Sequence, residues 1–248
     1  MSRTRLFLAA LLALAIGAAA GPVLAQSLTF DMGEAGGSTT GRVIQMMALV
    51  TVLSLAPSIL IMMTAFTRIV IVLSFLRSAL GVPQVPPNTV MVSLAMFLTF
   101  FIMAPVMERS YQQGIQPLIA EQIDEAEAFT RAVAPFREFM LRHTSEKDLM
   151  LFVEMGRIGP IAEPMATPLQ VLVPAFMISE IKRAFEIGFL LFLPFLIIDM
   201  VVSSILMSMG MMMLPPTMVA IPFKIIFFVL VDGWYLIAGS LARSFGTL

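Results

Sequence analysis

Residues 207–216 read MSMGMMMLPP and separate two long apolar runs, Ile187–Met209 and Met218–Ala242. A glycine can end a helix with a positive φ angle, and a following pair of prolines fixes an extended turn and starts the next helix. The stretch therefore predicts a helical hairpin, and five methionines are concentrated at its turn. The predicted turn residues are Gly210, Pro215 and Pro216.

The same arrangement of glycine and prolines occurs earlier, in residues 81–90, which read GVPQVPPNTV. Both stretches follow the pattern G-x4-P-P-x-x-V and lie between apolar runs. The repeat is either a coincidence or the mark of two similar hairpins whose turns lie on the same side. The earlier stretch contains no methionine, so the turn itself does not require that residue. Its predicted turn residues are Gly81, Pro86 and Pro87, and Asn88 is expected to cap the helix that follows.

The composition favours a membrane protein or a subunit buried in an assembly. Of 248 residues, 59% are hydrophobic and 12% are charged, and the mean hydropathy is +0.96; a soluble domain is usually about 25% charged. The net charge of −1 provides no basic surface for nucleic acid. There is no cysteine, and the single histidine, His143, is expected on the surface, so no metal or cofactor site is predicted. No catalytic motif is present, so we do not expect an enzyme.

The N-terminal 1–25 segment has the pattern of a secretory signal peptide. Two arginines precede an apolar run, and small residues stand before a cleavage point between Ala25 and Gln26. The alternative is a short first transmembrane helix. Cleavage would leave the new N-terminus outside the cytoplasm. Residues 26–45, rich in Gly, Ser and Thr, are expected to be flexible.

The rest of the chain divides into three predicted parts. Residues 46–107 form a first apolar helical hairpin, in which Pro57 is expected to break the long first helix. Residues 108–170 alternate charged and apolar faces at helical spacing and predict a small soluble α-helical subdomain. Residues 171–248 form the second hairpin, with Val171–Phe185 expected as a separate helix. No strand alternation occurs, so the predicted class is all-α.

Charged residues embedded in the apolar runs are the first candidates for function. An intramembrane charge costs at least about 2.5–3.5 kcal/mol, so each needs a partner or water. Asp199 and Asp232 suit either proton or cation handling or structural pairing with Lys224 or Arg68. The embedded charges outside residues 180–186 are Arg68, Arg77, Asp199, Lys224 and Asp232.

A second candidate is the charge cluster in the segment EIKRAFE, residues 180–186. Its acids and bases are three or four residues apart, so they can pair on one helix surface. The cluster is either a self-neutralised helix segment at the membrane edge or a belt of ion pairs between subunits or along a pore. Its members are Glu180, Lys182, Arg183 and Glu186.

The methionines in the 207–216 turn have three interpretations. They can be ordinary core filling, although a turn is an unusual place for it. Thioethers also bind Cu(I), so a methionine-lined Cu(I) or soft-metal transporter is an alternative function. Finally, methionine is flexible and adaptable, so several copies of the turn around an axis could form a deformable apolar plug that closes a pore.

Several motifs together resemble the FliP family, membrane subunits of the flagellar type III protein export gate with relatives in virulence injectisomes. The motifs are LR-x-ALG-x-P-x-x-PPN from Leu76, SEIKRAFEIGF from Ser179, PFLIIDMVV from Pro194, GMMMLPP from Gly210, and IPFKIIFFVLVDGW from Ile221.

The resemblance implies a ring-like helical pentamer with FliQ and FliR type subunits in the inner membrane at the flagellar basal body. Such a gate conducts unfolded flagellar proteins, and the N-terminus after cleavage and residues 108–170 lie on the periplasmic side. It also implies that the helices can be held above the bilayer plane. The methionines that correspond to the family's pore gasket are Met209, Met211, Met212 and Met213.

Overall fold

The computed structural model describes residues 39–246 except positions 83, 160, 162 and 212. The predicted signal peptide, its Ala25–Gln26 cleavage point and most of the predicted flexible segment lie outside the described residues. The chain divides into two compact units, 1–50 and 51–248. The second unit contains both predicted turns and all the predicted charged and methionine site residues.

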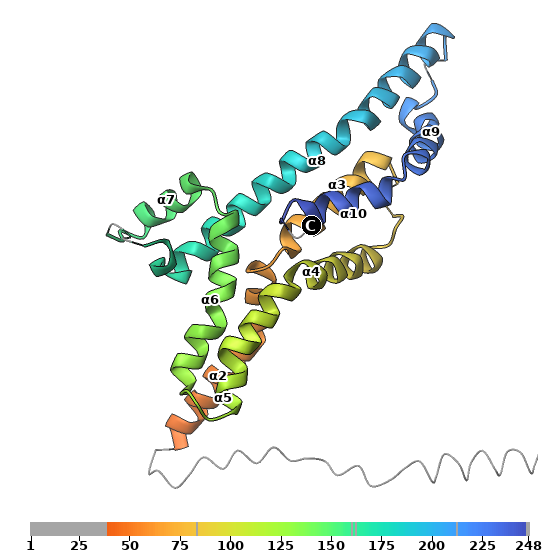
Figure 1. The fold of residues 1–248 in the computed structure, drawn as a ribbon. Coiled ribbons are helices and arrows are strands. Elements are labelled where there is room, and N and C mark those ends of the chain that lie inside the picture. The colour runs from red at the N-terminus through yellow and green to blue at the C-terminus, as the bar shows by residue number, and fades with distance from the viewer. Residues whose placement is uncertain (1–38, 83, 160, 162, 212, 247–248) are drawn as a thin grey trace, which may run out of the picture. The chain divides into compact units, whose positions relative to one another are not determined.

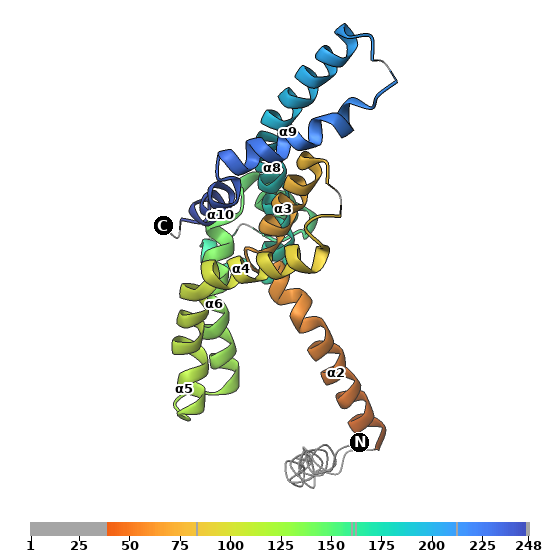
Figure 2. The same cartoon turned by 90° about the vertical axis from the view of Figure 1, so that its right-hand side faces the viewer.

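The described residues form helices joined by short loops, and none of them lies in a strand, which confirms the all-α class. Figure 1 and Figure 2 show the helices from two directions. The helices are α2 (Thr39–Met62), α3 (Phe66–Leu80), α4 (Asn88–Ser110), the π-helical η1 (Tyr111–Ile115), α5 (Gln116–Ile119), α6 (Glu125–His143), α7 (Glu146–Met155), the short 3-10 helix η2 (Pro164–Ala166), α8 (Leu169–Ser208), α9 (Pro216–Leu230) and α10 (Gly233–Arg243).

The first apolar run breaks at residues 63–65 and not at Pro57, as the sequence had suggested; α2 continues through that proline. The hydroxyl of Thr64 explains the position of the break. It donates to the carbonyl of Ile61 at 3.0 Å and accepts the backbone N–H of Phe66 at 3.4 Å. A threonine that hydrogen-bonds nearby backbone groups replaces the bonds that a helix would lose there.

The region from Leu169 to Ser208 is one continuous helix, α8, of 40 residues. The sequence had suggested separate helices before and after Glu186. A helix of this length extends about 60 Å. Pro174 and Pro194 lie within it without ending it. The expected single last helix is instead two, α9 and α10, which meet at 63° where Asp232 adopts the left-handed conformation (φ 51°).

Helix α3 packs along α8, and α4, α6, α7 and α9 pack around this pair. The main core contains Ile69 and Leu73 of α3, Met103 of α4 and Phe176 of α8, all with at most 1% of their surface exposed. At Gly188 of α8 an added Cβ would lie 2.5 Å from the ring of Phe75, so glycine permits the close approach of the two helices.

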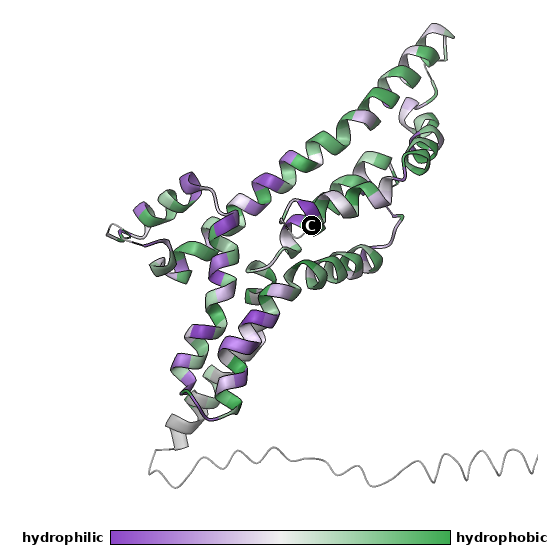
Figure 3. Cartoon of the chain, in the orientation of Figure 1, coloured by the Kyte–Doolittle hydropathy of each residue, from purple (hydrophilic) through white to green (hydrophobic). Residues whose placement is uncertain are grey.

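Hydrophobic residues dominate α8 and α9, whereas hydrophilic residues gather on α6 and α7 and at the end of α4 (Figure 3). Two helical stretches among the described residues are long and apolar enough to cross a membrane, Asn88–Ile119 and Leu169–Ser208. The bent pair α9–α10 is a third if it counts as one span. The protein is therefore an all-α chain with two or three apolar membrane-spanning helices.

Candidate functional site: the methionine turn and its ion pairs

The turn between α8 and α9 is closed by a glycine in the left-handed conformation, Gly210 with φ 75°. The N–H of Gly210 donates to the carbonyl of Met207 at 3.1 Å, and the N–H of Met211 donates to Leu206 at 3.0 Å. This pair of bonds is the Schellman ending, which satisfies the last carbonyls of a helix. Pro216 then begins α9 with its φ angle already set for a helix.

The turn between α3 and α4 begins in the same way, although its Val85–Pro86 peptide bond is cis. Gly81 also has φ 75°, and its N–H donates to the carbonyl of Ser78 three residues earlier, at 3.1 Å. In each turn the carbonyl after the glycine accepts the N–H three residues further on, from Val85 at 3.1 Å and from Leu214 at 3.4 Å. The repeated sequence pattern therefore corresponds to repeated turn geometry.

Three methionines of the α8–α9 turn, Met209, Met211 and Met213, are exposed. The exposed fractions are 62% for Met209, 43% for Met211 and 99% for Met213, and Leu214 is 46% exposed. Met212 lies outside the described residues. Ordinary core filling therefore does not account for these three side chains.

Lys224 connects α9 both to α8, through an ion pair, and to the end of α3, through a hydrogen bond. The ammonium of Lys224 in α9 lies 2.7 Å from a carboxylate oxygen of Asp199 in α8. It also donates to the carbonyl of Ala79 in the last turn of α3, at 3.0 Å. Lys224 is 4% exposed, so this contact replaces its hydration. Of the two roles left open for Asp199, this structure provides the structural pairing.

Arg77 and Asp232, the other embedded charges near the turns and the α9–α10 bend, are more exposed than Lys224. Arg77 donates to the side-chain oxygen of Asn88 at 2.6 Å and joins the two ends of the α3–α4 turn. Asn88 had been expected to cap α4; its oxygen receives this bond instead, and Pro87 occupies the cap position. Asp232 is exposed at the bend between α9 and α10.

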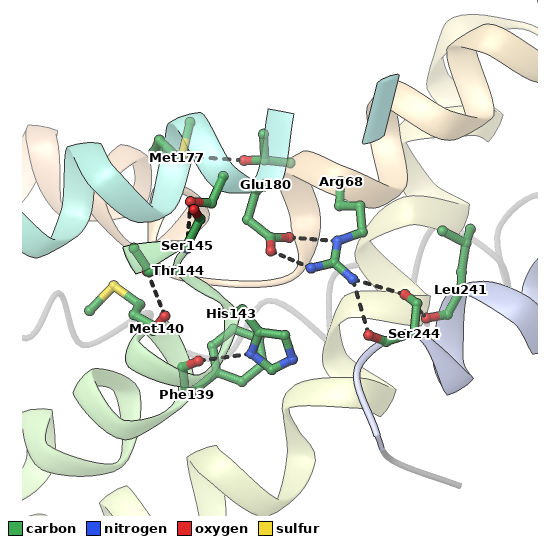
Figure 4. Close-up of polar contacts among 12 residues, drawn as sticks. Arg68, Phe139, Met140, His143, Thr144, Ser145, Met177, Glu180, Leu241 and Ser244 are labelled. Atoms are coloured by element: carbon green, nitrogen blue, oxygen red, sulfur yellow. Dashed lines mark hydrogen bonds and ion pairs between the residues drawn. The ribbon is translucent and has the colours of Figure 1, made fainter. Parts of the chain in front are cut away.

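A second ion pair lies in the core, between Arg68 of α3 and Glu180 of α8 (Figure 4). The guanidinium contacts both carboxylate oxygens, one of them at 2.9 Å through Nε. It also donates to the carbonyl and the hydroxyl of Ser244, at 3.2 and 3.0 Å, and lies 3.8 Å from the centre of the Phe245 ring. Neither charged side chain exceeds 1% exposure.

This burial changes the interpretation of the 180–186 cluster. Glu180 was expected to be able to meet Arg183 on the helix surface, but it faces the core and binds Arg68. Lys182, Arg183 and Glu186 remain exposed. These three are the members of the cluster that other molecules can reach.

His143 is partly buried, which corrects the expectation of a surface histidine. Its ring packs against Phe139 and Phe245, with ring centres 4.6 and 5.2 Å away, and Nδ1 lies 2.8 Å from the carbonyl oxygen of Phe139 (Figure 4). Burial lowers the pKa of His143 below its usual value, and the nearby positive charges of Arg68 and Arg183 act in the same direction.

Sequence reasoning missed the groups that complete these networks. Ser179 donates to a carboxylate oxygen of Asp148 at 2.7 Å and accepts the N–H of Ser145 at 2.9 Å, which joins α7 to α8. Ser145 occupies the cap position of α7 without a side-chain capping bond. Within the described part of the chain, no three His, Asp or Glu residues are grouped so as to hold a metal ion.

These features define a class: an all-α membrane-associated protein whose buried charges are paired internally and whose methionine turn is exposed. Residues 49–241 match the model of the FliP family, and this chain belongs to that family. The family resemblance seen in the sequence motifs is thereby confirmed.

Similar proteins carry the name flagellar biosynthetic protein FliP. That of Caulobacter vibrioides is 60% identical over 210 residues, covering 85% of this chain and 79% of the relative. That of Bacillus subtilis is 55% identical over 202 residues, covering 82% and 91%. That of Aquifex aeolicus is 50% identical over 204 residues, covering 82% and 85%. The shared name refers to flagellar biosynthesis and denotes no class of enzyme.

Proposed function

We propose that the chain is a pore-forming subunit of the flagellar type III protein export gate, in which the methionine turn acts as a gasket. The exposure of the turn carries the proposal: Met209 and Met213 are adaptable apolar side chains that the fold leaves largely uncovered, and Met211 is partly exposed beside them. Turns from several copies that meet at an axis exclude water and ions by close packing. An inserted polypeptide displaces them, because such a seal has no fixed shape.

The exposed apolar surface supports assembly with other helical subunits. Only 11% of the most apolar window of α8 is buried within the chain. Large apolar side chains such as Phe189, Leu190 and Met200 are more than 60% exposed. The surface therefore requires lipid or other protein. The family resemblance supports a homopentamer with FliQ and FliR type subunits, in the inner membrane at the flagellar basal body. The charged region 108–170 then lies on the periplasmic side.

The gasket is tested in cells that carry the triple change Met211→Ala, Met212→Ala and Met213→Ala. Alanine removes most of the side-chain volume, so we expect ion leak, seen as a drop in membrane potential with a voltage-sensitive dye, and altered secretion of flagellar subunits. The matched control is Val82→Ala with Val85→Ala in the α3–α4 turn. Unchanged leak and export in the methionine variant would disprove the plug.

Subunit contacts through the exposed charges are tested with Arg183→Glu. We expect the reversed charge to weaken the oligomer on native gels, with Lys147→Glu on exposed α7 as the control. An intact pentamer in the Arg183 variant would count against a role in assembly. Metal analysis of the same purified material tests the alternative function, a Cu(I) transporter. A small oligomer that contains copper would favour the transporter over the export gate.

A further inference from the structure

A cavity of about 490 Å³ lies where α4, α6 and the C-terminal end of the chain meet, apart from the methionine turn. Its wall is apolar along α4, at Phe101, Ile102 and Val106, and it is closed by Phe139 and Phe245. Its polar side is formed by Arg109, Arg142 and His143. The cavity is thus amphiphilic, with cationic groups on one side.

The two arginines at the cavity share one carboxylate. Glu138 accepts from Arg109 at 2.7 Å and also binds Arg142. Hydrogen bonding and charge attraction from Arg109 hold the pKa of Glu138 below its usual value, so it contributes one negative charge at neutral pH. Two guanidinium groups against one carboxylate leave one positive charge at the cavity. Arg142 remains 68% exposed, with further N–H groups free for an anion.

The position of the cavity along α4 matches a membrane interface. Residues 88–107 of α4 contain no charged side chain, and about 20 helical residues span about 30 Å, the thickness of the hydrocarbon core. Glu108 and Arg109 follow at once, so the cavity lies at the end of this stretch. On the apolar side, Phe101 lines the cavity and Phe97 lies one helical turn before it on the same face of α4, and both are exposed by 59% or more.

We propose that this cavity binds one anionic phospholipid from the surrounding bilayer, with its phosphate at Arg109 and Arg142 and an acyl chain along the exposed phenylalanines of α4. Charge complementarity selects the anionic headgroup, and the guanidinium fork fits phosphate oxygens in pairs. The apolar wall selects a lipid over a free anion.

The test uses the purified full-length chain, exchanged into mixed micelles that contain either phosphatidylglycerol or phosphatidylcholine. Native mass spectrometry counts the lipid molecules retained per chain. We expect preferential retention of phosphatidylglycerol, weakened about fivefold by Arg142→Gln, since one basic residue near an anionic headgroup contributes about 1 kcal/mol. This variant keeps the Arg109–Glu138 pair, and an unchanged melting temperature verifies its fold.

Arg131→Gln is the matched control, because Arg131 is also an exposed arginine of α6 paired with a glutamate four residues earlier, yet it does not line the cavity. Phe101→Ala should reduce phosphatidylglycerol retention as well. Equal losses in the Arg131 and Arg142 variants, or equal retention of both lipids, would overturn the proposal. Displacement of the lipid by inorganic phosphate alone would show a free-anion site instead.

Discussion

The two hairpin turns share a left-handed glycine and two backbone hydrogen bonds, and they differ in their contacts with the rest of the fold. Each has a left-handed glycine, the same pair of backbone hydrogen bonds and a proline at the start of the next helix. At Gly81 the turn lies against α9, where Ile221 and the ammonium of Lys224 are within 4 Å of an added Cβ. At Gly210 no atom of the described residues, its two chain neighbours apart, lies within that distance. One turn is fastened to the fold, and the other projects from it.

The comparison distinguishes the residues that form a turn from the side chains that give it further contacts. Glycine and proline satisfy the backbone in both places, so the side chains are free to differ. At the α3–α4 turn, the backbone carbonyl of Ala79 accepts from Lys224 of α9, and Arg77 donates to Asn88 across the turn. In the α8–α9 turn the exposed side chains include Met209, Met211 and Met213, whose flexible apolar form suits the proposed gasket.

The largest effect is expected from Lys224→Met, which removes the fastening of the first turn. Asp199 loses its partner in a partly buried site, where one of its oxygens already has no hydrogen-bond partner, and breaking a buried pair costs about 3–5 kcal/mol. Equilibrium unfolding in detergent measures the loss. The double variant Lys224→Met, Asp199→Leu should recover most of it, because no unpaired charge remains. A single variant as stable as the wild type would show that Lys224 does not fasten the turn.

The next effect compares Gly81→Ala with Gly210→Ala. Both glycines have φ 75°, a conformation that costs residues with a Cβ about 1–2 kcal/mol. The nearest atom to the new methyl at Gly81 is 3.5 Å away, an ordinary contact, so we expect similar losses of unfolding free energy at both turns. A much larger loss at Gly81 would show that its neighbours cannot accommodate a methyl group.

A smaller effect is expected from Arg77→Ala, which removes the side-chain bond across the α3–α4 turn. The bond is exposed, so its loss should cost about 0.5–1 kcal/mol. A double-mutant cycle with Asn88→Ala isolates the interaction between the two side chains. Simple additivity of the two single losses would mean that the bond contributes nothing.

Mild acid should lower the stability of the folded protein through His143. Its folded pKa is lowered, so the unfolded chain, near pKa 6.5, takes up the proton first, and stability falls as pH drops through about 6.5 toward the folded value. We expect a lower melting temperature at about pH 5.5 than at about pH 7.5. His143→Gln should reduce this difference, and an unchanged difference would assign it to other groups.

The smallest effect is expected from replacing Met209, Met211 and Met213 by leucine. These side chains are exposed, and surface substitutions usually change stability by no more than about 0.5 kcal/mol. Calorimetry in detergent should therefore show no shift, while the stiffer leucines should alter ion leak in cells. A clear loss of stability would mean that the methionines pack within the chain.

The sequence was sufficient to predict the helical class and both turns, because glycine, proline and apolar periodicity act over a few residues. It also identified Arg68, Glu180, Asp199 and Lys224 as charges that need partners. It could not pair Arg68 with Glu180, since 112 residues separate them and no local pattern encodes that contact. The continuity of α8 from Leu169 to Ser208 was also missed, because the sequence was divided into separate helices before and after Glu186.

The unbroken length of α8 makes it a lever arm. Glu180 fixes one part of the helix to α3, and Gly210 lies about 30 residues, or about 45 Å, further along. A tilt of about 5° about the Arg68–Glu180 contact would displace the methionine turn by about 4 Å, on the scale of one side chain. Any tilt of α8 about this contact would therefore be largest at the turn.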